Sequence, residues 1–129
     1  MAEPQNIPIV QGMFAAFGRG DIASVLDAVS EDVDWQTFGQ IPQGGQRRGR
    51  AGVGAFFAKV GEILEFSKFE PRQFIAQGDA VVALGGYTAR AKHTGRSFDA
   101  EWAMVFTFRT GKVVKFREYV DTGAMLAAL

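Results

Sequence analysis

Asp121 is the residue whose type and surroundings point most directly to chemistry. It ends a β-forming stretch, residues 113–121, and the strand pairing described below places Tyr119 and Trp102 beside it. A carboxyl group among such side chains is partly desolvated, which raises its pKa and suits it to act as a general acid or base. The same carboxylate also stands where it would cap a helix over residues 122–129. Both interpretations remain open.

The neighbours of Asp121 follow from one hairpin. Thr110-Gly111 is typical of a two-residue turn, so residues 98–109 and 113–121 are expected to pair as antiparallel strands. In that register the face with Asp121 carries Phe106, Met104, Trp102, Arg117 and Tyr119. The other face carries Thr107, Val105, Ala103, Val114, Phe116, Glu118 and Val120. Because the helices of so short a chain can cover only one side of this sheet, we expect the face with Asp121 to form the floor of a cavity.

The other elements that would enclose this cavity follow from hydrophobic periodicity. A spacing of three and four residues predicts helices over 10–17, 22–29 and 53–64, the second capped by Asp21. Alternating β-formers predict strands over 33–38, 69–77 and 80–92, in addition to the hairpin. Residues 1–6 are expected to form a flexible arm, and the glycine-rich residues 39–52 a loop. Together these elements predict a single α+β domain over residues 1–129.

Aromatic side chains outside the hairpin are candidates for the cavity wall. Trp35 and Phe38 lie on the first predicted strand, and Tyr87 lies on the longest one. With Trp102, Met104 and Tyr119 they would form a largely apolar binding surface, although Trp35, Phe38 and Tyr87 are each more typical of a core. Buried Tyr and Trp side chains need a hydrogen-bonding partner, which a ligand or water often supplies. Arg117 is expected either to bind an anionic or carbonyl group of a ligand or to pair with an acidic side chain from a helix.

Composition narrows the classes of function. The 129 residues contain 14 basic and 14 acidic side chains, so the chain lacks the positive excess of a nucleic-acid-binding protein. Zero cysteines exclude disulfides and thiolate ligands, and a single histidine excludes a histidine-rich metal site. We therefore predict no metal, no cofactor and no nucleic-acid partner. The sequence contains neither a signal peptide nor a membrane-spanning run, which predicts a cytoplasmic protein without a membrane partner.

The second face of the hairpin also needs a cover, because it carries apolar residues such as Val105, Val114 and Phe116. A second copy of the chain packed on the same face would supply one, which predicts a homodimer through the sheet. The alternative is that the C-terminal tail of the same chain covers these residues.

These patterns together resemble the SnoaL-like, ketosteroid-isomerase-related branch of the NTF2-like superfamily. The resemblance covers residues 7–129, and its most specific pieces are Thr94-Gly-Arg-Ser-Phe98, Phe106-Thr-Phe-Arg-Thr-Gly-Lys112 and Phe116-Arg-Glu-Tyr-Val-Asp121. It implies an NTF2-like cone in which three N-terminal helices pack on a strongly curved antiparallel sheet, followed by a short C-terminal helix. It also implies dimerisation through the sheet.

The resemblance implies a role for Asp121 as well, because SnoaL-like polyketide cyclases use an aspartate at the end of this strand as an acid/base. Limonene-epoxide hydrolase is similar in the same stretch, but this chain has Trp35 and Thr37 where that family has Tyr and Asn. It also lacks an Arg-x-Asp pair in the strand 81–91, which disfavours epoxide hydrolysis. In ketosteroid isomerases the base comes early in the sheet, where Asp34 approximates the position without a second buried carboxyl group opposite.

Two hypotheses follow for the function. The first is a cofactor-independent enzyme of the cyclase or isomerase type, in which Asp121 exchanges a proton with a small, mostly apolar, carbonyl-bearing molecule. The second is a non-catalytic module of the same fold that binds a ligand or dimerises. They can be distinguished by the surroundings of Asp121: an open pocket favours catalysis, whereas oxygens bonded to the amides of Gly123 and Ala124 favour the module.

Overall fold

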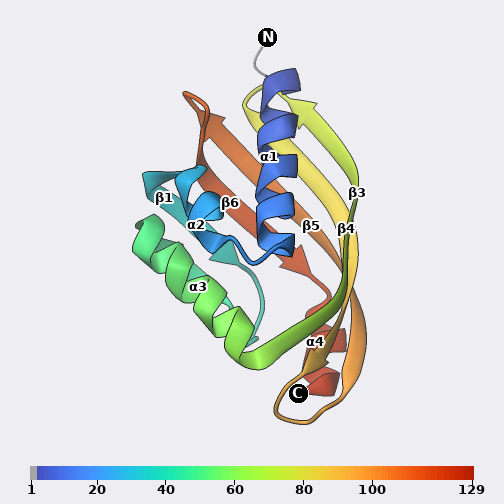
Figure 1. Cartoon of the computed structure of the whole chain (residues 1–129). Coiled ribbons are helices and arrows are strands. Elements are labelled where there is room, and N and C mark those ends of the chain that lie inside the picture. Colours follow the sequence, from blue (N-terminus) through green and yellow to red (C-terminus); the bar gives the residue numbers. More distant parts are fainter. Residues whose placement is uncertain (1–2) are drawn as a thin grey trace.

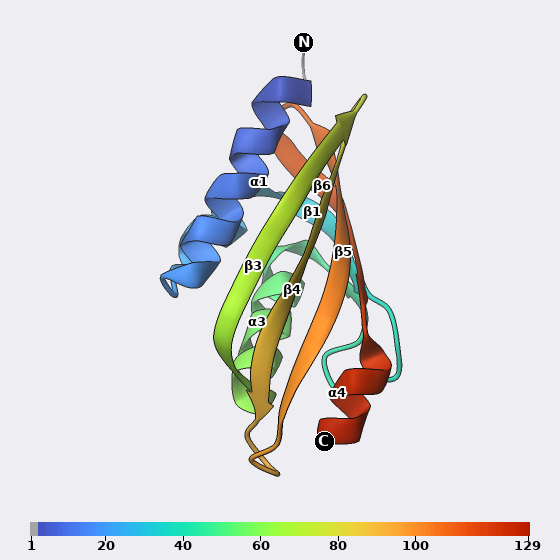
Figure 2. The same ribbon diagram turned by 90° about the vertical axis from the view of Figure 1, so that its right-hand side faces the viewer.

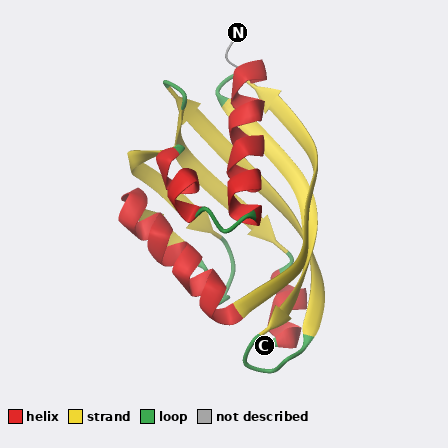
Figure 3. Cartoon of the chain, viewed as in Figure 1, coloured by secondary structure: helices red, strands yellow, loops and turns green. Residues whose placement is uncertain are grey.

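A computed structural model of the chain describes residues 3–129 (Figure 1). The helices are α1 (Glu3–Gly18), α2 (Ile22–Asp27), α3 (Gly49–Ile63) and α4 (Thr122–Ala128). The strands are β1 (Val29–Thr37), β2 (Gly45–Arg48), β3 (Leu64–Gln77), β4 (Ala80–Ala91), β5 (Ser97–Arg109) and β6 (Lys112–Val120). Figure 3 shows how these helices and strands divide the chain. The α+β class, the three N-terminal helices and the short C-terminal helix are confirmed.

The six strands form one sheet in the order β2-β1-β6-β5-β4-β3. Neighbouring strands are antiparallel except β1 and β6, which run parallel. Strand β2 was not predicted, because its four residues lie in a glycine-rich stretch that was expected to be a loop. It pairs with β1 and extends the sheet under α3. Of the loop expected over residues 39–52, only residues 39–44 lie outside a strand or helix.

The helices lie close to where the periodicity predicts them, but α2 ends at Asp27 rather than at residue 29, and α3 begins at Gly49 rather than at residue 53. Asp21 caps α2 through a hydrogen bond that Ser24 N donates to its Oδ1 at 3.1 Å. Helix α1 begins at Glu3, so the prediction of an arm over residues 1–6 is wrong for residues 3–6. The side chain of Asn6 is already buried. Residues 1 and 2 of the predicted arm lie outside the described residues.

The helices α1, α2 and α3 all cover the same face of the curved sheet (Figure 2). Helix α1 packs on β3 and β4, and α3 packs on β1. Helix α4 packs against β4 and β5 near the end of the sheet. A buried core fills the space between the helices and the sheet. No helix in the described part of the chain is both long and apolar enough to cross a membrane.

The hairpin between β5 and β6 has the predicted turn but not the predicted register. Thr110 and Gly111 both have positive φ, and Arg109 pairs with Lys112, as expected for a two-residue turn. Next to the turn, however, Phe108 pairs with Val113 whereas Thr107 pairs with Lys115. Val114 is therefore the extra residue of a β-bulge.

This bulge reverses the faces of β6 relative to the prediction. Phe106 pairs with Phe116, Met104 with Glu118 and Trp102 with Val120. A shift of one residue moves every following side chain to the other face of the strand. Phe116 and Glu118 therefore lie on the covered side of the sheet, and their predicted place on the outer face is wrong.

Candidate functional site

A largely apolar cavity of about 70 Å³ lies between the helices and the sheet. All three N-terminal helices contribute to its wall, together with β1, β3, β4, β5, β6 and the loop between β1 and β2. Most of the lining side chains are aromatic or aliphatic. Only four carry a polar group: Glu118, Tyr87, Gln43 and the indole of Trp35. Any chemistry in this cavity must come from these few groups.

Glu118 is the buried carboxylic acid of the cavity. Its side chain is 7% exposed, and its Oε1 accepts a hydrogen bond from Thr37 Oγ1 at 2.9 Å. Neighbouring segments hold the backbone of Glu118 on both sides of β6. Glu118 pairs with Met104 of β5, and its carbonyl oxygen accepts a hydrogen bond from Phe38 N at 3.1 Å. Among the described residues no Lys, Arg or His forms an ion pair with it. A buried carboxyl group without a cation is expected to hold a proton more tightly than usual.

The electrostatics of the cavity follow from this burial. Burial raises the pKa of Glu118 from 4.5 to about 7, against a smaller lowering by the Thr37 hydrogen bond. Burial, and then the charges of Glu118 and Asp121, also raise the pKa of Tyr87 above its ordinary value. Near neutrality the cavity therefore combines a carboxyl group that both gains and loses a proton with a phenol that stays protonated.

Three of the predicted binding residues line this cavity: Trp35, Tyr87 and Met104. Trp35 stacks on Phe116 with ring centroids 3.8 Å apart and is flanked by Phe56 and Phe57. Their position agrees with the prediction, and their role in binding remains a prediction.

Asp121 does not line the cavity, so its predicted position there is wrong. It is exposed and caps α4, because Ala124 N donates a hydrogen bond to its Oδ1 at 3.0 Å. The sequence left the choice between cap and acid/base open, and this bond is the one expected of a cap. The proposed chemistry of Asp121 depended on its position in the cavity.

Arg117 and Tyr119 also lie outside the cavity, because the bulge turns them to the outer face. Arg117 Nη2 lies 2.9 Å from Asp34 Oδ2, so its acidic partner comes from β1 rather than from a helix. The hydrogen bond from Arg117, and then the one from Gln46, lowers the pKa of Asp34. Tyr119 is 49% exposed and stacks on Phe38, which is itself exposed at the end of β1. The predicted place of Phe38 in the cavity wall is therefore wrong as well.

Trp102 is buried but belongs to the core next to the cavity and does not line it. Its ring stacks on Phe14 and on Phe69, with centroids 5.4 Å apart in each pair. Gly85 makes room for it, since a Cβ there would lie 2.7 Å from Trp102 Cζ2. The same Cβ would collide with the carbonyl oxygen of Glu70 on β3, so the glycine is required by the close approach of both the indole and the β3 backbone.

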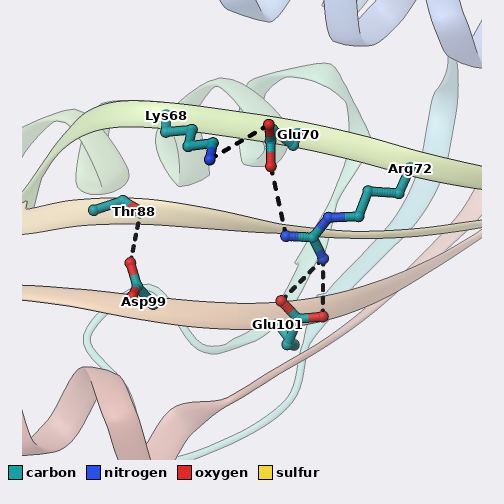
Figure 4. A network of polar contacts seen from close by, with 6 residues as sticks. All are labelled: Lys68, Glu70, Arg72, Thr88, Asp99 and Glu101. Atoms are coloured by element: carbon teal, nitrogen blue, oxygen red, sulfur yellow. Dashed lines mark hydrogen bonds and ion pairs between the residues drawn. The ribbon is translucent and has the colours of Figure 1, made fainter.

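The outer face of β3, β4 and β5 carries a polar network (Figure 4). Arg72 Nη1 lies 2.9 Å from Glu101 Oε1, and Arg72 Nη2 lies 3.6 Å from Glu70 Oε1. Thr88 Oγ1 donates a hydrogen bond to Asp99 Oδ1 at 2.6 Å. Together with Lys68 these side chains surround an open hollow of about 230 Å³. Within residues 3–129 no group of three or more His, Cys, Asp or Glu side chains is arranged to hold a metal ion.

Comparison with known proteins agrees with the fold. The chain is 41% identical to an NTF2-like protein from Burkholderia xenovorans LB400, with a TM-score of 0.90 over 99% of this chain and 98% of that one. It is 30% identical to TerC, whose structure was determined with polyporic acid, with a TM-score of 0.86 over 95% and 96%. The uncharacterised protein Rv0034 of Mycobacterium tuberculosis H37Rv is 24% identical over 96% of this chain and 95% of its own length.

A sequence profile of the SnoaL-like domain matches residues 10–116, from α1 to β6. The matched span contains all six strands in whole or in part and most of the cavity lining. The protein therefore belongs to the SnoaL-like family, within the NTF2-like fold.

Proposed function

We propose that the protein catalyses a proton transfer on a small, mostly apolar, carbonyl-bearing molecule bound in the cavity, and that Glu118 is the acid/base. This is the isomerase or cyclase type of chemistry suggested by the sequence, with Glu118 in the place that the sequence assigned to Asp121. No redox step is involved: the carboxylate removes a proton from the carbon next to a carbonyl group and returns one to another atom of the substrate.

The observation that carries this proposal is the environment of Glu118. Its carboxyl group lies in an apolar cavity, accepts one hydrogen bond from Thr37, and has its pKa raised to about 7 by burial. A catalytic acid/base works best when its pKa lies near the working pH. Tyr87 lines the same cavity and keeps its proton, so it is suited to stabilise negative charge that develops on a substrate oxygen.

The size of the cavity limits the substrate. At about 70 Å³ it is smaller than the ~300–1,000 Å³ of most ligand pockets. A molecule with one ring is the natural first probe, and a larger one requires the phenylalanine rings of the wall to move. TerC, which has the same fold, was co-crystallised with polyporic acid, and this supports an organic molecule as the ligand class here.

The test is hydrogen–deuterium exchange of cyclohexanone in D₂O, followed by proton NMR with and without the protein. We expect the protein to accelerate loss of the signal from the protons next to the carbonyl group. The rate should rise with pH and level off above a midpoint near 7, because only the ionised form of Glu118 removes a proton.

No acceleration, or acceleration without that midpoint, would contradict the proposal. The alternative, a non-catalytic module, is then favoured. The capping role of Asp121 is the observation that supports this alternative. In that case cyclohexanone should still bind to the protein, and its exchange rate should equal the rate in buffer.

We propose in addition that two copies of the chain pair through the outer face of the sheet. Apolar side chains gather on this face of the central strands, at Val82, Leu84, Ala103 and Val105. The charged side chains around this apolar centre are largely paired within the chain, Arg72 with Glu70 and Glu101, and Arg117 with Asp34. A two-fold axis along the central strands would bring the apolar centres of the two copies together, with these ion pairs at the rim.

The test of this pairing is sedimentation of the Val105→Glu variant. We expect the unaltered chain to sediment as a dimer at micromolar concentration and Val105→Glu as a monomer, because a charge in the apolar centre of the face costs binding energy. The variant should still fold, since Val105 is only half-buried on the outer face of the single chain. Ala55→Glu, at an exposed position of α3, is the control and should remain dimeric. A monomeric unaltered chain, or a dimeric Val105→Glu, would refute the pairing.

A further inference from the structure

Two of the polar groups around the cavity have no partner. Trp35 Nε1 and Gln43 Oε1 are both buried and form no hydrogen bond with any described residue. Both residues line the cavity, and their side chains are 3% and 4% exposed. Native proteins pair more than about 90% of such buried groups, because an unpaired one costs free energy. Two unpaired groups on the wall of one cavity therefore call for a common explanation.

Gln43 is held in place by the loop between β1 and β2. Its Nε2 donates a hydrogen bond to Met125 Sδ at 3.4 Å, which leaves Oε1 as the free atom of the amide. The loop closes on itself through a bond from Gly44 N to Ile41 O at 2.9 Å. A Cβ at Gly44 would collide with the carbonyl oxygen of Gly39, so this closure needs a glycine. The loop thus fixes a glutamine at a depth where this residue type is seldom found unpaired.

Trp35 is held just as firmly. Its indole stacks on Phe116 at an interplanar angle of 18° and contacts the rings of Phe56 and Phe57. The indole N–H is a donor only, and it cannot turn to another partner without breaking these ring contacts. Two residues that line the cavity thus hold one fixed, unpaired donor, Trp35 Nε1, and one fixed, unpaired acceptor, Gln43 Oε1.

We propose that Trp35 and Gln43 form a subsite for a hydroxyl group, so that the carbonyl-bearing ligand of the cavity also carries a hydroxyl group, as an alcohol, a phenol or an enol does. This rests on the proposed function in that the same cavity binds the substrate. A hydroxyl group accepts from the indole N–H and donates to the amide oxygen. A ketone or ether oxygen only accepts, and it leaves Gln43 Oε1 unpaired.

The test compares the binding of phenol, anisole and toluene by calorimetry. Phenol both donates and accepts, anisole only accepts, and toluene does neither. We expect phenol to bind roughly tenfold more tightly than anisole, because only phenol pairs the amide oxygen. In Gln43→Met this preference should fall to less than about threefold, since the acceptor is gone.

A second readout separates a binding role from a purely structural one. Gln43→Met should also raise the melting temperature of the ligand-free protein by about 3 °C, because removal of an unpaired buried acceptor outweighs loss of the weak hydrogen bond to Met125 Sδ. A glutamine that only supports the fold would give a lower melting temperature. Gln46→Met is the matched control: this amide is exposed on β2 and bonds to Asp34, so its loss should leave the phenol preference unchanged.

The outcomes distinguish this subsite from the proposed chemistry. Phenol binding no tighter than that of anisole, or a preference that survives Gln43→Met, would overturn the subsite and point to water or Glu118 as the partner. Failure of all three probes to bind would overturn it as well. Phenol binding needs no ionised Glu118, so the Glu118→Gln variant should keep the preference even though it is expected to lose proton exchange.

Discussion

Replacing Glu118 with glutamine is expected to slow the exchange of cyclohexanone protons by about 100- to 10,000-fold at a pH above the midpoint, the usual contribution of a general base. Glutamine fills nearly the same space and can keep a hydrogen bond to Thr37, but it cannot take up a proton. The cavity and its aromatic wall should therefore stay in place, and only the acid/base is removed. The measurement is the exchange rate by proton NMR at equal protein and probe concentrations.

Two variants control for this result. Asp121→Asn should leave the exchange rate unchanged, because Asp121 caps α4 and lies outside the cavity. Thr37→Val should move the midpoint of the pH profile upwards, because the Thr37 hydrogen bond lowers the pKa of Glu118. If Glu118→Gln exchanges as fast as the unaltered chain while Asp121→Asn is inactive, the acid/base is Asp121 and the assignment to Glu118 fails.

The stability of the protein is expected to fall as pH rises from about 4.5 to above 7, by about 3 kcal/mol relative to Glu118→Gln, since each pKa unit corresponds to about 1.4 kcal/mol. The pKa of Glu118 is 4.5 in its ordinary environment and about 7 in the fold. Between these values the folded state holds the proton and the unfolded state does not, so protons favour folding. The contribution is complete below the unfolded pKa and is lost as pH passes the folded one.

Urea unfolding of both chains across this pH range measures the effect. The difference between the two free energies of unfolding isolates Glu118, because every other titrating group is shared. Asp34, for example, has a lowered pKa, so its stabilising effect is lost only at lower pH and is the same in both chains. A difference that does not change with pH would mean that Glu118 keeps an ordinary pKa, which would also weaken the proposed chemistry.

The sequence predicts most of the fold because its local signals are strong. The apolar spacing that begins at Val10 gives α1, and Asp21 caps α2 as expected. The turn at Thr110-Gly111 gives the hairpin between β5 and β6. Strand β2 is missed because its formation depends on pairing with β1, a tertiary interaction that leaves no pattern in four polar and glycine residues.

The site is predicted less well, and one residue accounts for most of the difference. An unbroken strand after the turn puts Asp121 inside and Glu118 outside, whereas the bulge at Val114 reverses them. The sequence does contain a signal for this bulge. Val113 and Phe116 are both apolar and lie three residues apart, and a regular strand cannot place two such residues on the same face. Gln43 offers no such signal, because only the folded loop brings it to the cavity.

The extra residue at Val114 also means that two changes of equal length in this hairpin have opposite consequences. Loss of Val114 itself would leave a regular strand in which Arg117 still lies opposite Val105 and Glu118 opposite Met104, so the interior would keep its carboxyl group. Loss of one residue after the bulge, at Lys115 or Phe116, would instead turn the guanidinium of Arg117 inwards and the carboxylate of Glu118 outwards. Relatives that differ by one residue at that later point would share an architecture yet enclose opposite charges.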